Sequence, residues 1–249
     1  MPKPQNKQLL SVVVPAYKQQ KTIEENLKRI QKVLDNSRYK YEIICVVDGR
    51  TDNTAREVKK IKSSKIRVMD YQKNQGKGHA VRLGMTKSRG GVIAFIDAGL
   101  ELNPEVLLMG MEHFDWYKAD IIVGSKRHQA SKVDYPMQRR VLSFGYQILV
   151  RILFGLKIRD TQLGMKIFRR KVLEKTLPRL LVKRYAFDIE MLAVAHHLGF
   201  KRIYESPVDI DYDFEDLTHA SAMRSIFRMF WDTIAVFYRL RILHYYDKK

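Results

Sequence analysis

Short apolar segments alternate with amphipathic segments through the first hundred residues, and this alternation restricts the possible fold more than any other feature of the chain. Apolar runs typical of strands occupy residues 9–14, 41–47, 65–69 and 92–96. Patterns typical of helices lie between them, in residues 22–36, 52–60 and 78–88. Strands and helices that alternate at this spacing predict an α/β fold, with a mostly parallel sheet covered by helices on both faces.

Turn-forming and polar residues stand where three of these strands are expected to end. The first strand leads into Pro15, Ala16 and Tyr17, the second into Asp48, and the fourth into Asp97. In open parallel sheets, ligands bind at the carboxyl ends of the strands. The sequence therefore predicts a binding site along this edge.

A lysine on a glycine-hinged loop precedes the helix at residues 78–88. Gly76 and Gly78 flank Lys77, and glycine lets a backbone approach a ligand closely. Loop N–H groups at a helix N-terminus, together with a lysine, suit a diphosphate, and Asp97 suits a divalent metal that bridges it. Lys77 is expected either to pair with Asp48 or Asp97 or to contact phosphate.

The second half of the chain has a different pattern. Residues 121–124 and 201–211 are predicted strands, residues 126–140 are basic and irregular, and residues 187–198 form a predicted helix. The almost wholly apolar helix expected at 140–155 is too short to cross a membrane, so it is either buried or in the lipid interface. A long amphipathic helix is expected at 220–246, lying either on anionic lipid or on its own domain or a second subunit.

Composition adds three expectations. The net charge of +19 implies an anionic partner, which charge alone leaves open among nucleic acid, a membrane surface and a phosphorylated substrate. The single cysteine, Cys45, lies in a predicted strand and can form no internal disulfide, which fits a cytoplasmic setting. No apolar secretory signal and no membrane-spanning run are visible, and the seven histidines show no metal-ligand spacing.

Five motifs together resemble the polyprenyl-phosphate branch of glycosyltransferase family 2, which includes dolichyl-phosphate mannosyl- and glucosyltransferases. They are residues 14–17 (VPAY), 48–52 (DGRTD), 74–84 (NQGKGHAVRLG), 160–166 (DTQLGMK) and 185–190 (YAFDIE). The last two are specific to this branch and are most similar to its glucosyl members. The resemblance implies a GT-A fold over residues 1–218, with a nucleotide-sugar half (1–125) and an acceptor half (126–218), followed by the C-terminal amphipathic helix (219–249).

The chain departs from the family pattern in three places. Lys18 and Gln19 stand where Asn-Glu is usual, and Val47 replaces the first of two adjacent acids. The family's Asp-X-Asp metal motif retains Asp97 but has Gly99 in place of the second aspartate. Glu101 can restore the lost carboxylate, because hard cations accept any well-placed oxygen. The alternatives are weak metal binding or a catalytically inactive protein.

The resemblance also implies the roles of individual residues. The nucleotide-binding residues would be Pro15, Ala16, Tyr17, Gln19, Asp48, Lys77, Asp97 and Ala98, with Mg²⁺ or Mn²⁺ on Asp97 and Glu101. Asp48 would hydrogen-bond the base or ribose, whereas Tyr17 would pack either on the base or in the core. The acceptor and sugar would contact Lys126, Arg127, Arg139, Arg140, Ser143, Gln162, Asp188 and Glu190, and the residues closest to the chemistry would be Asp97, Arg139 and Gln162. For Asp188 and Glu190, structural pairing is the alternative.

The implied activity is metal-dependent, inverting transfer of glucose or mannose from UDP-glucose or GDP-mannose to a polyprenyl phosphate. The protein would bind peripherally to the cytoplasmic face of a membrane. Two alternatives remain open: a family 2 transferase with a polysaccharide acceptor, and a non-catalytic membrane- or partner-binding relative. Nucleic-acid binding rests on the net charge alone, without a recognition motif, and is not expected.

Overall fold

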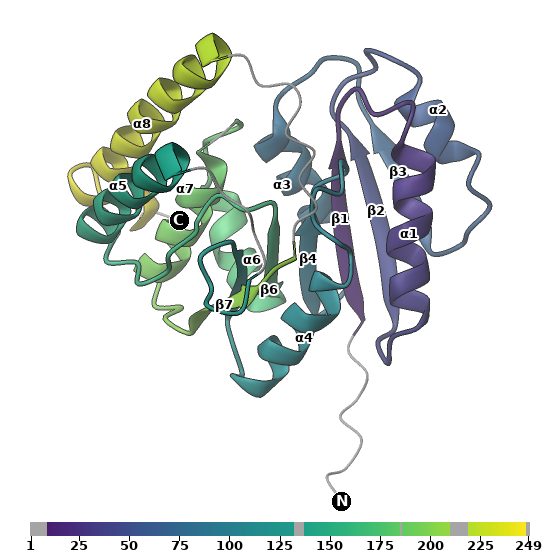
Figure 1. Ribbon diagram of the computed structural model, residues 1–249, viewed down its shortest axis with the longest axis horizontal. Coiled ribbons are helices and arrows are strands. Elements are labelled where there is room, and N and C mark those ends of the chain that lie inside the picture. The colour runs from purple at the N-terminus through teal and green to yellow at the C-terminus, as the bar shows by residue number, and fades with distance from the viewer. Residues whose placement is uncertain (1–8, 132–136, 185, 210–218, 248–249) are drawn as a thin grey trace, which may run out of the picture.

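The computed structural model describes residues 9–131, 137–184, 186–209 and 219–247, with only the backbone described in 137–143 and 219–226. Seven strands form one sheet in the order β3-β2-β1-β4-β6-β5-β7 (Figure 1). Their bounds are β1 (Leu10–Ala16), β2 (Tyr41–Val47), β3 (Ile66–Asp70), β4 (Val92–Ile96), β5 (Ile121–Ser125), β6 (Met165–Arg169) and β7 (Ile203–Pro207).

One strand runs against all the others. β1, β2, β3 and β4 pair in parallel with their neighbours, as do β5 and β7, whereas β6 is antiparallel to both β4 and β5. In this register Met165, the first residue of β6, lies opposite Ile96, the last residue of β4. The segment that enters β6 therefore lies at the same edge of the sheet as Asp97.

Helices cover both faces of the sheet and enclose two separate cores. The first core contains side chains of α1 (Ile23–Asp35), α2 (Thr54–Lys59) and α4 (Val106–Trp116). The second contains side chains of α3 (Lys77–Lys87), α6 (Arg170–Thr176) and α7 (Phe187–His197), together with α5 (Met137–Phe154) and α8 (His219–Arg241). Because successive residues of a strand point to opposite faces, Val13 and Ile44 belong to the second core, whereas Val12 and Ile43 belong to the first.

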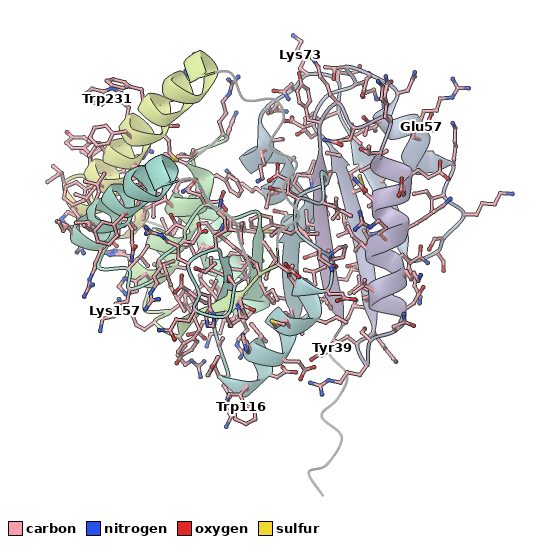
Figure 2. All side chains as sticks on the ribbon, viewed as in Figure 1. Tyr39, Glu57, Lys73, Trp116, Lys157 and Trp231 are labelled. Carbon is pink, nitrogen blue, oxygen red and sulfur yellow. The ribbon has the colours of Figure 1, made fainter. Side chains whose placement is uncertain are left out.

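Helices α5 and α8 lie side by side at one end of the molecule (Figure 1). The Tyr146 hydroxyl lies 2.9 Å from Oγ1 of Thr233, and the rings of Phe154 and Phe237 meet edge to face. The outer surface of α8 carries exposed apolar side chains beside Arg228: Trp231 is 60% exposed and points away from the protein (Figure 2). The helix is thus docked on its own domain by one face and leaves another apolar face uncovered.

The predicted α/β fold with a mostly parallel sheet is confirmed, and Cys45 is buried in β2 as expected. Sequence analysis missed α4, β6 and α6. In β6 two of the five residues are basic, which concealed the strand, because Lys166 is fully buried against a carboxylate. The C-terminal helix ends at Arg241 rather than near 246, because the chain turns at His244, which has a positive φ of 48°, into a 3₁₀ turn at Tyr245–Asp247.

No helix in the described part of the chain is both long and apolar enough to cross a bilayer.

Candidate active site

The loop before α3 and the end of β4 meet through an ion pair. Nζ of Lys77 lies 2.7 Å from each oxygen of Asp97 and donates a hydrogen bond to Oδ2. Oδ1 of Asp97 is buried and receives no hydrogen bond from any described residue. Of the partners expected for Lys77, the structure therefore shows Asp97.

A glycine on the segment entering β6 makes room for this carboxylate. The N–H of Asp97 donates to the carbonyl of Gly164 at 3.1 Å. A Cβ atom at Gly164 would overlap the Asp97 carboxylate. The absent side chain at 164 thus lets the DTQLGMK segment lie directly against Asp97, which brings the two halves of the predicted site together.

A second, buried ion pair lies behind the first. Nζ of Lys166 is fully buried, contacts the carboxylate of Asp188 at 2.5 Å and donates to the carbonyl of Leu163 at 2.9 Å. The ammonium groups of Lys77 and Lys166 both lie over the ring of Phe95, at 6.0 and 5.2 Å from its centroid. Two ammonium groups therefore lie over one aromatic ring, and each is paired with a carboxylate.

The charges of this group and its burial shift the pKa values of Lys77 and Asp188. Burial disfavours the charged form of Lys77, but Asp97, Asp188 and Glu101 outweigh burial and raise its pKa. Burial also raises the pKa of Asp188, although Lys166 and Lys77 act in the opposite direction. Lys77 is thus held as a cation at the edge where a diphosphate would lie.

Asp48 organises the lysine loop. Its carboxylate accepts hydrogen bonds from the Tyr71 hydroxyl (2.8 Å), the Asn74 amide (2.8 Å) and the main-chain N–H groups of Gln75 (2.8 Å) and Gly76 (2.9 Å). Such a carboxylate fixes a loop by satisfying its main-chain donors. The structure therefore shows Asp48 as the support of the loop, and its expected contact with base or ribose stays a prediction.

The turn after β1 lies at the same edge of the sheet. Pro15 and Ala16 are buried within β1, whereas Tyr17 is 43% exposed, which rules out core packing as its role. Gln19 ties this turn to α2, because its N–H donates to Oγ1 of Thr54 at 2.9 Å. An exposed ring on a fixed turn can stack on a nucleobase.

The segment 98–101 after β4 contains Glu101, the second residue predicted to bind the metal. Ala98 is buried, and its carbonyl accepts a hydrogen bond from the Asn26 amide at 2.8 Å. Glu101 is exposed and lies close enough to Lys77 to influence its pKa. A Cβ atom at Gly99 would meet nothing within 4 Å, so packing does not require the glycine that replaces the family aspartate.

On the acceptor side, Asp160 joins two of the segments predicted to bind substrate, its own motif and the segment of Lys126. Its carboxylate accepts hydrogen bonds from the N–H groups of Lys126 (3.2 Å), Gln162 (3.1 Å) and Leu163 (3.2 Å). The guanidinium of Arg127 donates to the side-chain oxygen of Gln147 on α5. The structure thus brings Lys126 and Gln162 onto one carboxylate. The side chains of Arg139, Arg140 and Ser143 lie outside the described residues.

Glu190 is fully buried on α7. Its oxygens accept hydrogen bonds from the N–H groups of Leu181 and Val182 and from the Tyr246 hydroxyl. This is the structural pairing that the sequence left open as an alternative, and contact of Glu190 or Asp188 with substrate stays a prediction.

Sequence reasoning missed four residues that shape the site: Asp160, Gly164, Lys166 and Asn74. Three of them stand inside the DTQLGMK motif, whose Asp-X-Gln spacing is typical of an aspartate that caps its own turn. Lys166 gave no signal, because burial of a lysine depends on a carboxylate from a distant helix.

Comparison with solved structures identifies the fold type. A glucosyl-3-phosphoglycerate synthase from Mycobacterium tuberculosis, solved with Mn²⁺, UDP-glucose and phosphoglyceric acid, superimposes with a TM-score of 0.71. The match covers 92% of this chain and 80% of that chain at 16% identity, and it shows that the fold is of GT-A type.

Residues 11–177 match the family described as Glycosyl transferase family 2, and the chain belongs to this family. A dolichyl-phosphate beta-glucosyltransferase of Drosophila melanogaster is 35% identical over 206 residues, which are 76% of this chain and 63% of that protein. One from Trichomonas vaginalis is 31% identical over 260 residues, covering 96% of this chain and 77% of that protein. The family expected from the motifs is thus confirmed. The chain spans less than two thirds of the Drosophila protein.

Proposed function

We propose that this chain transfers glucose from a nucleotide diphosphate sugar to a dolichyl or other polyprenyl phosphate, with inversion at the anomeric carbon. The observation that carries the proposal is the Lys77–Asp97 pair, held between the glycine loop and the DTQLGMK segment at the carboxyl edge of the sheet. The names of the relatives support the glucosyl group and the lipid acceptor.

The donor diphosphate would lie against the loop of Gly76 to Gly78. Lys77 supplies a cation and the start of α3 supplies main-chain N–H groups, which together favour an anionic ligand. Asp48 keeps the loop in place, and Tyr17 would stack on the base. Uridine is the proposed base, because the M. tuberculosis protein with this fold was solved with UDP-glucose.

The residues present fit a divalent metal. Asp97 offers a carboxylate at the strand end, which a metal would share with the Lys77 ammonium that lies 2.7 Å from Oδ1, and Glu101 adds a carboxylate four positions on. No group of three or more His, Cys, Asp or Glu side chains suited to a metal occurs in the described part of the chain. Mg²⁺ or Mn²⁺ needs only one or two carboxylates when phosphate oxygens and water complete its shell. A bound metal would neutralise charge on the departing nucleoside diphosphate.

The acceptor phosphate would approach from the side of Asp160. Lys126 and Arg127 stand on the segment that Asp160 holds, and Arg139, Arg140 and Ser143 are proposed to complete the phosphate site. A phosphate monoester oxygen is already anionic near neutral pH, so the reaction needs no strong general base. Positioning by these cations and by Gln162, together with charge neutralisation at Lys77, would carry the rate.

The paired helices α5 and α8 would place the site at a lipid surface. Their uncovered apolar side chains include Phe144, Ile148, Ile152, Phe227, Trp231 and Tyr238. Exposed apolar helix faces on a chain with a net charge of +19 suit peripheral binding to anionic lipid, here the cytoplasmic face of a membrane.

A transfer assay tests the proposed function. Purified protein is incubated with radiolabelled UDP-glucose or GDP-mannose, dolichyl phosphate in detergent, and Mn²⁺ or EDTA. We expect label in the organic phase with UDP-glucose and Mn²⁺, and little with GDP-mannose or EDTA. Label recovered only in an added polysaccharide would favour the alternative acceptor. Nucleotide binding without any transfer would favour a non-catalytic relative.

A further inference from the structure

A buried tyrosine near the C-terminus reaches the interior of the domain. Tyr246 follows α8 in the 3₁₀ turn Tyr245–Asp247 and is fully buried. Its hydroxyl donates to Oε1 of Glu190 at 2.6 Å and accepts from Nε of Arg239 at 3.2 Å. Its carbonyl accepts from Nε of Arg179 at 2.8 Å. Burial and the neighbouring Glu190 raise the pKa of Tyr246, so the hydroxyl stays protonated and donates.

Glu190 links Tyr246 to the chain segment 180–184, which we call the strap. Its carboxylate accepts the N–H groups of Leu181 at 3.0 Å and Val182 at 2.8 Å. The strap has no regular secondary structure to bind these two donors, so the Glu190 carboxylate satisfies them and holds this side of the strap.

The strap in turn packs against the loop that carries Lys77. The carbonyl of Lys183 accepts the N–H of His79 at 3.2 Å, and the carbonyl of Leu180 accepts the Arg82 guanidinium at 2.6 Å. A Cβ atom at Gly76 would lie 2.5 Å from the Lys183 carbonyl oxygen. The turn that presents Lys77 therefore packs so closely against the strap that no side chain fits at position 76.

Apolar packing holds the strap only in part. Leu180 is buried in the second core and Val182 packs against that core. A small, mainly apolar cavity lies among the strap, α3 and α7, lined among others by Arg82, Leu180, Val182 and Phe187. The strap is therefore also held by polar contacts at its two sides, with Glu190 on one side and α3 on the other.

We propose that Tyr246 and Glu190 are positioning residues of the donor site. They hold the strap against the turn at Gly76 and Lys77. The position of the chain after α8 therefore sets the affinity for the nucleotide. Neither residue touches substrate in this role. The inference rests on the proposed function for the identity of the nucleotide, but its structural part can be tested without any activity.

The test compares wild-type protein with Tyr246→Phe, which deletes one hydroxyl, and with Tyr245→Phe as the matched control. Tyr245 stands in the same turn, and its hydroxyl makes no hydrogen bond within the described residues. Amide hydrogen exchange is followed by mass spectrometry for peptides covering residues 181–184, residues 76–80 and, as a reference, β1. Exchange reports local opening at each of these places separately.

In Tyr246→Phe we expect exchange to accelerate at least about threefold in both 181–184 and 76–80, with β1 unchanged, because loss of one buried contact opens its neighbours first. The dissociation constant for UDP with Mn²⁺ should rise about threefold to tenfold, and the KM for the donor should rise likewise with kcat nearly unchanged. Glu190→Gln replaces the carboxylate that accepts two main-chain N–H groups with a neutral amide. This variant should show the same pattern more strongly. Tyr245→Phe should match the wild type.

Three results would overturn the proposal: faster exchange at 181–184 with 76–80 unchanged, equal acceleration in every peptide including β1, or the same change in both tyrosine variants. If wild-type protein bound neither UDP nor GDP, the proposed function would fail, and the exchange comparison would still decide whether Tyr246 positions the loop.

Discussion

Nζ of Lys77 lies 2.7 Å from the carboxylate of Asp97, so a cation from the loop before α3 and an anion from the end of β4 form one unit at the edge of the sheet. Lys77→Gln removes the cation that would stabilise the leaving diphosphate, while keeping most of the side-chain volume. We expect kcat/KM for glucose transfer to fall by about 10²–10³, which is typical when one charge-stabilising group is lost.

Lys73→Gln provides the control for this measurement. Lys73 precedes the same loop, but it is exposed and points away from the protein (Figure 2). Its loss should change kcat/KM less than twofold, since a solvated charge interacts weakly. Equal losses in the two variants would show that only the net charge of the loop matters, and the assigned role of Lys77 would be wrong.

The second prediction concerns the effect of a side chain at position 164 on metal binding. A Cβ atom there would overlap the carboxylate of Asp97, so Gly164→Ala must displace the aspartate or the strand. We expect the affinity for Mn²⁺ in the presence of UDP to fall by at least about tenfold, which is roughly the loss when metal ligands lose their support.

Gly145→Ala is the matched variant on α5, where a Cβ atom would meet nothing within 4 Å. This substitution should leave metal affinity unchanged and raise the free energy of unfolding slightly, by up to about 1 kcal/mol, because alanine favours a helix over glycine. Unchanged metal binding in Gly164→Ala, measured by calorimetry beside this control, would contradict the placement of Asp97.

The buried pair of Lys166 and Asp188 should be intolerant of single substitutions. Lys166→Met leaves a buried carboxylate without its partner, and we expect the free energy of unfolding in urea to fall by about 3–5 kcal/mol. Lys28→Met breaks an exposed pair with Glu24, whose side chains are 60% and 40% exposed, and should cost less than about 1 kcal/mol. Adding Asp188→Leu to Lys166→Met should recover part of the loss. A double variant less stable than the single one would argue against the pair.

Three partly buried histidines predict how stability depends on pH. Burial lowers the pKa values of His79, His113 and His196, and nearby Lys and Arg side chains add to this effect at His79 and His196. Below the ordinary histidine pKa of about 6.5, the unfolded chain therefore takes up protons that the folded protein does not. The contribution of these groups to stability is complete above about pH 6.5 and is lost as the pH falls through their lowered pKa values.

Urea unfolding at pH 7.5, 6.5 and 5.5 measures this effect, and NMR titration locates the individual midpoints. We expect the unfolding midpoint to fall between pH 6.5 and 5.5, and the three histidines to titrate below 6.5. In His79→Gln the fall should be smaller. Histidine midpoints above 6.5 would reverse the sign and contradict the burial of these rings.

The sequence predicted the sheet and the edge where its strands end, because apolar runs and glycine turns are local signals. It could not predict how the DTQLGMK segment reaches Asp97, since that depends on the antiparallel β6, whose lysine is buried by an aspartate 22 residues away. The contact of Asp160 with Lys126 was missed, and for Glu190 the choice between substrate contact and structural pairing stayed open. Both carboxylates accept main-chain N–H groups of other segments, which residue identity does not encode.

The most direct test of the central claim is a calorimetric titration of UDP-glucose into wild-type protein and into Asp97→Ala, each with Mn²⁺ and with EDTA. We predict binding to the wild type with a dissociation constant between about 1 µM and 1 mM, a range usual for enzyme substrates. EDTA or Asp97→Ala should weaken this binding at least about tenfold. Binding of the same strength in all four titrations, or no binding to the wild type, would contradict a donor site built on Lys77 and Asp97.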